Sequence, residues 1–263
     1  NCNFYGINSI LLSVGKNSKA YISSSNLSAD STGSNGLFAT DNGKIYANTD
    51  SINTTLDNSR GIDATYGGTV IGNKMTISTQ GDHSAALATD RGGGNVSVTN
   101  STLKTSGSGS PLIYSTGDIE VDNVTGTATG SQIAGMEGLN RILIYNSNLT
   151  SENKKTIGSD PVANAVILYQ STSGDADTST DKSAVFQAVD SNLKSSITSG
   201  AFFYVTNTSS NVYLENTKLN YDSSKANLIQ IEGNDSNNWG TAGSNGGTVK
   251  FTANNETLSG NVS

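Results

Sequence analysis

Cysteine, proline and histidine are nearly absent from this chain of 263 residues, which has one Cys, two Pro and one His. The lone Cys2 excludes an internal disulfide framework and a zinc site built on cysteines. No apolar run approaches the roughly 18 residues of a membrane-spanning helix, so no membrane span is predicted in this segment. Basic residues are also scarce. The net charge of -7 and the pI near 4.6 exclude nucleic acid as a partner, which requires a basic surface.

Hydrophobic residues are only 33% of the chain and charged residues 14%, whereas glycine occurs 29 times. This composition alone favours disorder. The modest net charge and the regular spacing of the apolar residues favour a folded protein instead. A chain with few apolar residues can fold when each turn buries a narrow, repeated core.

An internal repeat runs through the chain. Its pattern is apolar-x-apolar, a turn that contains Asn or Asp, and a closing apolar residue, as in VSVTNSTL (96–103) and ILIYNSNL (142–149). The closing positions are Leu27, Ile52, Ile77, Leu103, Gly126, Leu149, Leu193, Leu219 and Leu258, and the first gaps are 25, 25, 26, 23 and 23 residues. Asn at the turn tolerates the left-handed conformation, and successive Asn side chains can bond to each other as a ladder.

A second short apolar stretch precedes most copies, bounded by Gly or Asn as a strand would be. These stretches are 36–41, 61–66, 85–90, 111–116, 165–170, 201–206 and 227–232. The sequence therefore predicts an all-β fold, a single-stranded right-handed parallel β-helix of about nine coils. Each coil has about 25 residues and three short strands. A β-sandwich, with hairpins at 8–12-residue spacing, would not hold this register.

On these repeats the chain resembles right-handed parallel β-helix proteins, specifically the adhesin-like, Asn/Ser/Thr-rich surface proteins of anaerobic bacteria and archaea. The resemblance covers nearly the whole chain and implies a secreted, cell-surface protein. Pectate lyases and autotransporter passengers are similar in shape but differ in function, so the resemblance is specific for fold and weak for activity.

Residues 1–263 are predicted to be one β-helix domain, a segment of a longer solenoid. NCNF (1–4) matches NSTL (100–103), which places Phe4 at the closing position of an earlier coil. Insertions are expected at 151–164, 170–183 and 233–247. The last two leave from the same corner of the coil with one coil between them, so their roots should lie about 10 Å apart.

The two neighbouring insertions are the first candidate sites. Asp175, Asp177, Asp181 and Asp235 offer hard oxygen ligands suited to Ca²⁺, although solvated Asp in a loop explains them as well. No cofactor is required by the sequence, and Ca²⁺ is the one considered. Trp239 with Asn237 and Asn238 could form a sugar-stacking platform; the alternative is a Trp that folds back over the coil.

Two rows of outward side chains are further candidates. Tyr21 and Tyr46 should be neighbours in the row Tyr21, Tyr46, Ile71, Ser97, Glu120, Leu143, Gln187 and Tyr213, where aromatic residues could stack on polysaccharide. The row of the first strand is more apolar and consists of Phe38, Leu87, Ile113, Ile167, Phe203 and Ile229. An apolar stripe on a surface indicates a partner or a covering element, unless these residues point inward.

Catalysis has little support in the sequence. His83 is the only histidine and lies at a turn without a nucleophile motif. Glu120 and Glu137 could form a glycosidase pair, but the chain offers few acids and no catalytic motif. We therefore expect a non-catalytic extracellular surface protein, either an adhesin or a structural subunit. Its partners would be a carbohydrate, a host or cell-surface receptor, or copies of itself stacked end to end. The alternative is a polysaccharide lyase or a carbohydrate-binding module.

Overall fold

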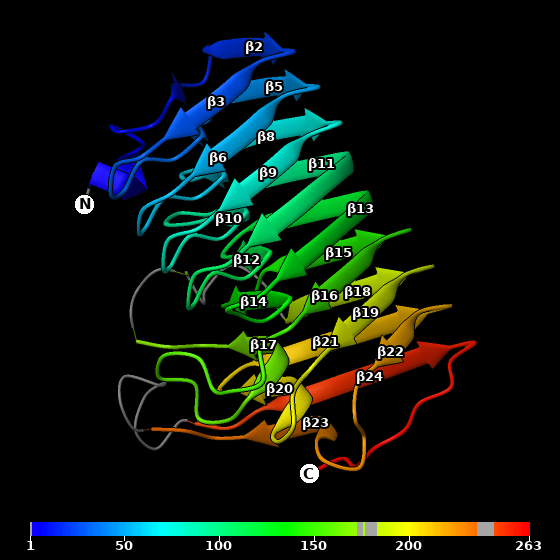
Figure 1. Cartoon of the computed structure of the whole chain (residues 1–263). Coiled ribbons are helices and arrows are strands. Elements are labelled where there is room, and N and C mark those ends of the chain that lie inside the picture. The colour runs from blue at the N-terminus through cyan, green and yellow to red at the C-terminus, as the bar shows by residue number, and fades with distance from the viewer. Residues whose placement is uncertain (1, 173–175, 177–182, 236–244) are drawn as a thin grey trace.

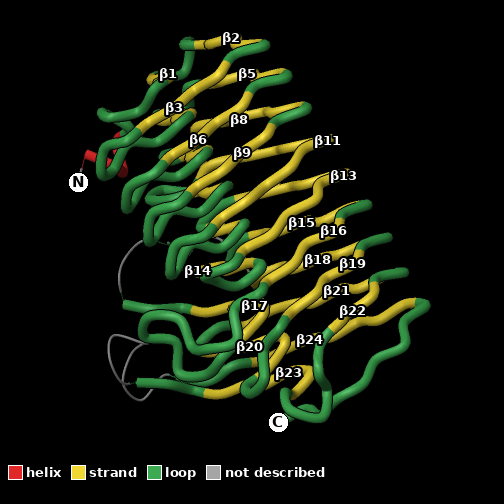
Figure 2. The backbone as a smooth tube through the Cα atoms, viewed as in Figure 1, coloured by secondary structure: helices red, strands yellow, loops and turns green. Residues whose placement is uncertain are grey.

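The computed structural model describes residues 2–172, 176, 183–235 and 245–263, which form a short 3₁₀-helix, η1 (Cys2–Tyr5), and parallel β-strands. The strands stack coil upon coil along one axis (Figures 1 and 2). This arrangement confirms the predicted right-handed parallel β-helix. Among the described residues, no helix is long and apolar enough to cross a membrane.

Sheet A is formed by the first strand of each coil and has nine parallel strands. In spatial order they are β1 (Leu11–Val14), β4 (Leu37–Thr40), β7 (Ile62–Ala64), β10 (Leu87–Thr89), β12 (Ile113–Ser115), β14 (Ala134–Glu137), β17 (Asn164–Tyr169), β20 (Ala201–Thr206) and β23 (Asn227–Glu232). Seven of these match the predicted first stretches. The sequence analysis missed β1 and β14, and β14 proves central to the site described below.

Sheet B is formed by the second strand of each coil, and the third strands continue it around the corner. The second strands are β2 (Lys19–Ser23), β5 (Lys44–Asn48), β8 (Gly68–Asn73), β11 (Gly94–Thr105), β13 (Asp118–Ala128), β15 (Arg141–Tyr145), β18 (Ala184–Val189), β21 (Ser209–Glu215) and β24 (Thr248–Asn254). The third strands are β3 (Asn26–Ala29), β6 (Ser51–Thr54), β9 (Thr76–Thr79), β16 (Asn148–Ser151), β19 (Asn192–Ser195) and β22 (Lys218–Asn220). Strands β11 and β13 run through the corner and belong to both rows.

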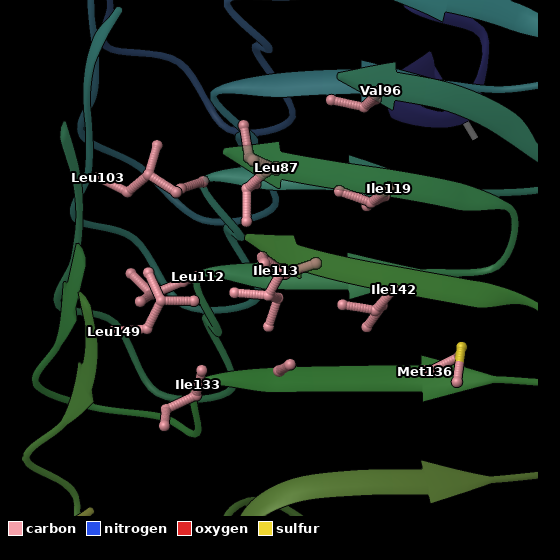
Figure 3. Close-up of a cluster of buried hydrophobic side chains, with 14 of the residues drawn as sticks. Leu87, Val96, Leu103, Leu112, Ile113, Ile119, Ile133, Met136, Ile142 and Leu149 are labelled. Carbon is pink, nitrogen blue, oxygen red and sulfur yellow. The ribbon is translucent and has the colours of Figure 1, made fainter. Parts of the chain in front are cut away.

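The closing positions of the repeat stack in register along the third strands, as predicted. Leu27 pairs with Ile52, and the pairing continues without a slip as far as Leu219. Gly126 provides no side chain in this row, but Leu112 fills the space, because a Cβ at residue 126 would lie 2.7 Å from Leu112 Cδ1. The core is therefore a continuous apolar column between the sheets (Figure 3).

Asparagine side chains form the predicted ladder at the turn between the second and third strands. Nδ2 of Asn73 donates to Asn48, Asn100 to Asn73, and Asn123 to Asn100, each at 2.8 Å. Asn100 and Asn123 have φ angles of 52° and 54°, in the left-handed region that Asn tolerates better than other side chains. Asn100 and Asn123 thus supply both the turn conformation and a bond between coils, whereas Asn48 and Asn73 supply the bond alone.

Asn100→Ala is expected to lower the free energy of unfolding by about 1–2 kcal/mol, because alanine is strained at positive φ and breaks two rungs of the ladder. Asn100→Gly removes the same bonds without the strain and should cost less. Urea unfolding of both variants measures the difference. Equal losses would show that backbone conformation contributes nothing at this turn.

Buried hydroxyl groups satisfy the backbone at the turn that leads from the third strand to sheet A. The amide of Ser34 donates to Ser59 Oγ, that of Ser59 to Ser84 Oγ, and that of Ser84 to Ser110 Oγ, at 3.0, 2.9 and 2.9 Å. These residues are all buried. Since a buried backbone amide needs a partner, the high serine content has a structural cause.

Three long connections interrupt the regular spacing of the coils. Two of the connections lead from sheet A to sheet B: 170–183 joins β17 to β18, and 233–247 joins β23 to β24. One coil, with β20 and β21, lies between them. The connection 152–163 instead joins the third strand β16 to β17 in sheet A. At the far end of the chain, Val262 pairs in parallel with Ile229 as a following first strand would.

Candidate functional site

The outer face of sheet A is buried, unlike an ordinary solvent-facing sheet. Its outward row in register is Phe38, Asp63, Ala88, Tyr114, Gly135, Ile167 and Tyr204. Phe38, Asp63 and Tyr204 have no solvent exposure. The predicted apolar row was therefore wrong in part: Phe38 and Ile167 face outward, but Leu87, Ile113, Phe203 and Ile229 occupy the alternate positions and pack in the core. Other segments of the chain cover this outer face of sheet A.

The N-terminal segment is one of these covering elements. The ring of Phe4 lies 4.4 Å from the Arg91 guanidinium carbon and 5.6 Å from that of Arg60, and Thr65 Oγ1 donates to the Phe4 carbonyl at 3.3 Å. The prediction that Phe4 closes an earlier coil was wrong. Stacking on two guanidinium groups holds it outside the solenoid instead, on the outer face of sheet A.

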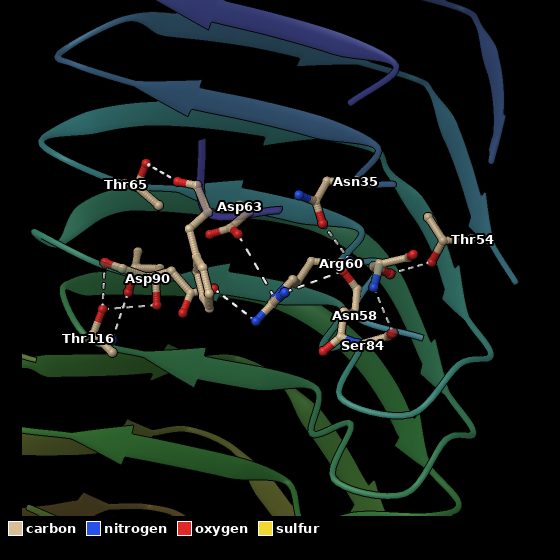
Figure 4. A network of polar contacts seen from close by, with 12 residues as sticks. Asn35, Thr54, Asn58, Arg60, Asp63, Thr65, Ser84, Asp90 and Thr116 are labelled. Atoms are coloured by element: carbon tan, nitrogen blue, oxygen red, sulfur yellow. Dashed lines mark hydrogen bonds and ion pairs between the residues drawn. The ribbon is translucent and has the colours of Figure 1, made fainter. Parts of the chain in front are cut away.

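Beneath Phe4 lies a buried ionic cluster that links β7 to the turn after β10 (Figure 4). Arg60 Nη2 is 3.1 Å from Asp90 Oδ2, and Arg60 Nε is 4.0 Å from Asp63 Oδ2. Burial and the neighbouring Asp90 carboxylate raise the pKa of Asp63 well above its ordinary range, opposed in part by Arg60. At neutral pH the cluster thus holds one guanidinium beside two closely spaced carboxyl groups.

A pocket of about 280 Å³ opens beside this cluster. It lies between the outer face of sheet A and the two segments that cover this face, η1 and the connection 152–163. Its walls come from the N-terminal segment, from successive coils of sheet A with their turns, and from the connection 152–163. The lining residues are Phe4, Arg60, His83, Ala85, Asp90, Gly109, Pro111, Tyr114, Gln132, Gly135, Ile157, Gly158, Ser159, Asp160, Ile167 and Tyr169. The mixture of aromatic rings, amide, carboxyl and apolar groups is typical of small-ligand sites.

Two tyrosine hydroxyls mark one side of the pocket. Tyr114 donates to Glu137 Oε2 at 3.1 Å and lies 3.5 Å from the Tyr169 hydroxyl. Glu137, which is buried, also accepts a hydrogen bond from Ser171. Burial, then the neighbouring Tyr169 and Glu137, raise the pKa of Tyr114 well above its ordinary value. The Tyr114 hydroxyl therefore stays neutral, and because it donates its proton to Glu137 it can accept a hydrogen bond from a ligand.

On the opposite side, Asp160 comes from the connection 152–163. Its Oδ2 accepts from Gln132 Nε2 at 3.0 Å and from Asn164 Nδ2 at 2.9 Å. Burial raises the pKa of Asp160 to about 6, although both amide bonds lower it. This carboxyl group therefore changes charge just below neutral pH.

The site residues predicted from the sequence lie elsewhere. The rings of Tyr21 and Tyr46 stack on sheet B with centroids 5.0 Å apart and planes 13° apart, which confirms their adjacency. Tyr21 is 74% exposed, and the binding role of the pair stays a prediction. Trp239, Asn237, Asn238, Asp175, Asp177 and Asp181 lie outside the described residues. Asp235 is described and exposed, and the described residues hold no cluster of three or more potential metal ligands.

Sequence reasoning missed most of the pocket. Glu120 and Glu137, considered as a catalytic pair, belong to the outward rows of sheet B and sheet A respectively, so they do not face each other across one site. Gly135 was missed because it interrupts the apolar pattern of its strand, and Asp160 because it lies in an insertion. Three signals were usable: the predicted insertion 151–164, which contains Asp160, the apolar outward row, which contains Ile167, and His83, a turn residue with a φ angle of 53°. All three residues line the pocket.

Comparison with family models, with curated proteins and with solved structures finds no match for this chain. The fold and the chemistry of the pocket therefore carry the functional proposal.

Proposed function

We propose that this chain is a non-catalytic, adhesin-like surface protein that binds a saccharide unit in the pocket over sheet A. The observation that carries the proposal is the pocket itself, because regular coils alone would leave the outer face of sheet A flat. Segments outside the repeat, η1 and 152–163, close over that face and leave this space. The composition and the resemblance to surface β-helices support the extracellular location.

The pocket has the size and chemistry for a sugar ring. Its volume of about 280 Å³ lies just below the range of ordinary ligand sites, roughly 300–1,000 Å³, which favours one ring over a long chain. Tyr114 and Tyr169 offer hydroxyls to a polyol, Gln132 offers an amide, and Phe4 and Ile167 provide apolar surface. Sugars bind through this combination of apolar and polar contacts.

The same contacts favour binding over cleavage. A glycosidase needs two carboxyl groups about 5–9 Å apart that face the scissile bond. Asp90 is paired with Arg60, and Glu137 accepts hydrogen bonds from Tyr114 and Ser171. Among the acids at the pocket, Asp160 alone keeps an oxygen without a described donor, so the pocket offers one open carboxyl group rather than a catalytic pair. The carbohydrate-lyase alternative predicts new reducing ends or unsaturated products, and we expect neither.

Gly135→Leu is expected to abolish saccharide binding, with at least a tenfold loss of affinity by an order-of-magnitude estimate, while the fold persists. A Cβ at residue 135 would lie 3.4 Å from Ile167 Cγ2 and 3.7 Å from Tyr114 Cδ2, so the backbone accepts a side chain. The rest of the leucine would fill the pocket. Glycan-array screening of the wild type, followed by calorimetry on both proteins, measures the effect.

Tyr21→Ala is the matched control, because it removes an exposed ring from sheet B and leaves the pocket intact. Its affinity should equal that of the wild type. Loss of binding in Tyr21→Ala but not in Gly135→Leu would move the site to sheet B. Binding that survives both changes but fails in Trp239→Ala would assign it to the 233–247 insertion.

A further inference from the structure

The charges around the pocket do not balance. The charged or titratable groups that line it are Arg60, His83, Asp90, Tyr114, Asp160 and Tyr169. Arg60 neutralises Asp90 through their ion pair. Glu137, which contacts the pocket-lining Tyr114, adds a further carboxyl group. No described Lys or Arg forms an ion pair with Asp160, and its pKa reflects burial and two amide bonds rather than a nearby cation.

Asp160 is also held in a fixed orientation. Gln132 and Asn164 both donate to the same oxygen, Oδ2, and Gln132 in turn accepts a hydrogen bond from Ser131. No described residue donates to Oδ1, and this atom is not among the buried unsatisfied oxygens, so it stays accessible. Asp160 is therefore a partly buried carboxylate in which one oxygen is anchored by hydrogen bonds and the other is open. It has no positively charged partner among the described residues to offset its burial.

We propose that the ligand of this pocket carries a protonated amino group that pairs with Asp160, as a hexosamine unit with a free amine does. This inference rests on the proposed saccharide-binding function and specifies its ligand class. An ammonium group donates to the open carboxylate oxygen and supplies the missing positive charge. A uronic acid would instead place a second carboxylate beside Asp160, and an N-acetylated amine would provide no charge.

Binding of such an amine depends on pH in a defined direction. Since burial raises the pKa of Asp160 to about 6, this carboxyl group is ionised above that pH and neutral below it. A ligand amine stays protonated throughout this range. Affinity for the amine should therefore fall about tenfold between pH 6.5 and pH 4.5, and affinity for a neutral sugar should not.

The experiment compares three oligosaccharides of equal length by calorimetry: glucosamine, N-acetylglucosamine and a neutral glucose oligomer. The wild type should prefer the glucosamine oligomer by tenfold or more at pH 6.5. Asp160→Asn keeps an oxygen to accept both amide bonds but removes the charge, so this preference and its pH dependence should disappear. Tyr21→Ala, on sheet B and outside the pocket, should keep the wild-type preference. The far-UV circular dichroism spectrum of Asp160→Asn should match that of the wild type, which controls for folding.

Two kinds of failure are distinguishable. If all three oligomers, or a uronic acid oligomer, bind as tightly as glucosamine and Asp160→Asn changes nothing, the amine inference is overturned while saccharide binding stands. If no oligosaccharide binds the wild type, or if binding is unaffected by Gly135→Leu, the proposed pocket function itself is overturned.

Discussion

Arg60→Met should lower the free energy of unfolding by about 3–5 kcal/mol at neutral pH. Methionine keeps most of the volume of the side chain but removes the charge between Asp63 and Asp90. Asp63 is fully buried and Asp90 is 1% exposed, so two carboxyl groups would remain in the interior without their cation. Phe4 would also lose one of its two guanidinium contacts.

The loss in Arg60→Met should depend on pH. Because the pKa of Asp63 is raised in the folded protein, the folded state holds this proton at pH values where the unfolded chain has released it. This group therefore makes the protein less stable as pH rises above its ordinary pKa of 3.8. Without Arg60 that pKa rises further, so the deficit of the variant should grow toward pH 8 and shrink toward pH 4.

Urea unfolding of Arg60→Met at several pH values checks this prediction. The double variant Arg60→Met/Asp90→Asn is the matched control, because it removes one uncompensated charge along with the cation and should recover part of the stability. A deficit that is the same at pH 4.5 and pH 8, with no recovery in the double variant, would show that packing rather than charge explains the loss.

The second large effect is expected in the core of the last coils, where four aromatic rings meet. Phe203 is fully buried, with its ring centroid 5.1 Å from Phe202, 5.4 Å from Phe186 and 5.9 Å from Phe251. Phe203→Ala should cost about 3–5 kcal/mol, because it leaves a cavity that the stacked strands cannot close. The rings come from both sheets, so the cavity would separate them.

Phe203→Leu is the comparison for this position and should cost roughly 1 kcal/mol, since most of the volume is kept. Because each coil contacts only its neighbours, hydrogen exchange in Phe203→Ala should accelerate in β18, β20, β21, β23 and β24 before it does in β5 or β8. Uniform acceleration along the whole solenoid would contradict this nearest-neighbour description.

The solenoid is predictable from the spacing of the repeat. A closing residue such as Leu103 recurs every 23–26 positions except across the two coils with long insertions, and only stacked coils place such residues in one column. The turn residue Asn100 follows from the same spacing, because a left-handed turn in each coil brings successive amides within hydrogen-bond reach. The register and the ladder were predictable because each depends only on the next coil, and the repeat encodes that contact directly. The inward positions of sheet A were not, since Leu87, Ile113, Phe203 and Ile229 were expected to face outward but pack in the core.

The tertiary structure alone decided what happens on the outer face of sheet A. The repeat does not specify that Phe4 stacks on Arg60 and Arg91, or that Asp160 reaches Gln132 across 28 positions of sequence. These contacts join segments outside the repeat to positions where the repeat tolerates any side chain. Their partners are set by how each covering segment packs in three dimensions, so no period in the sequence records them.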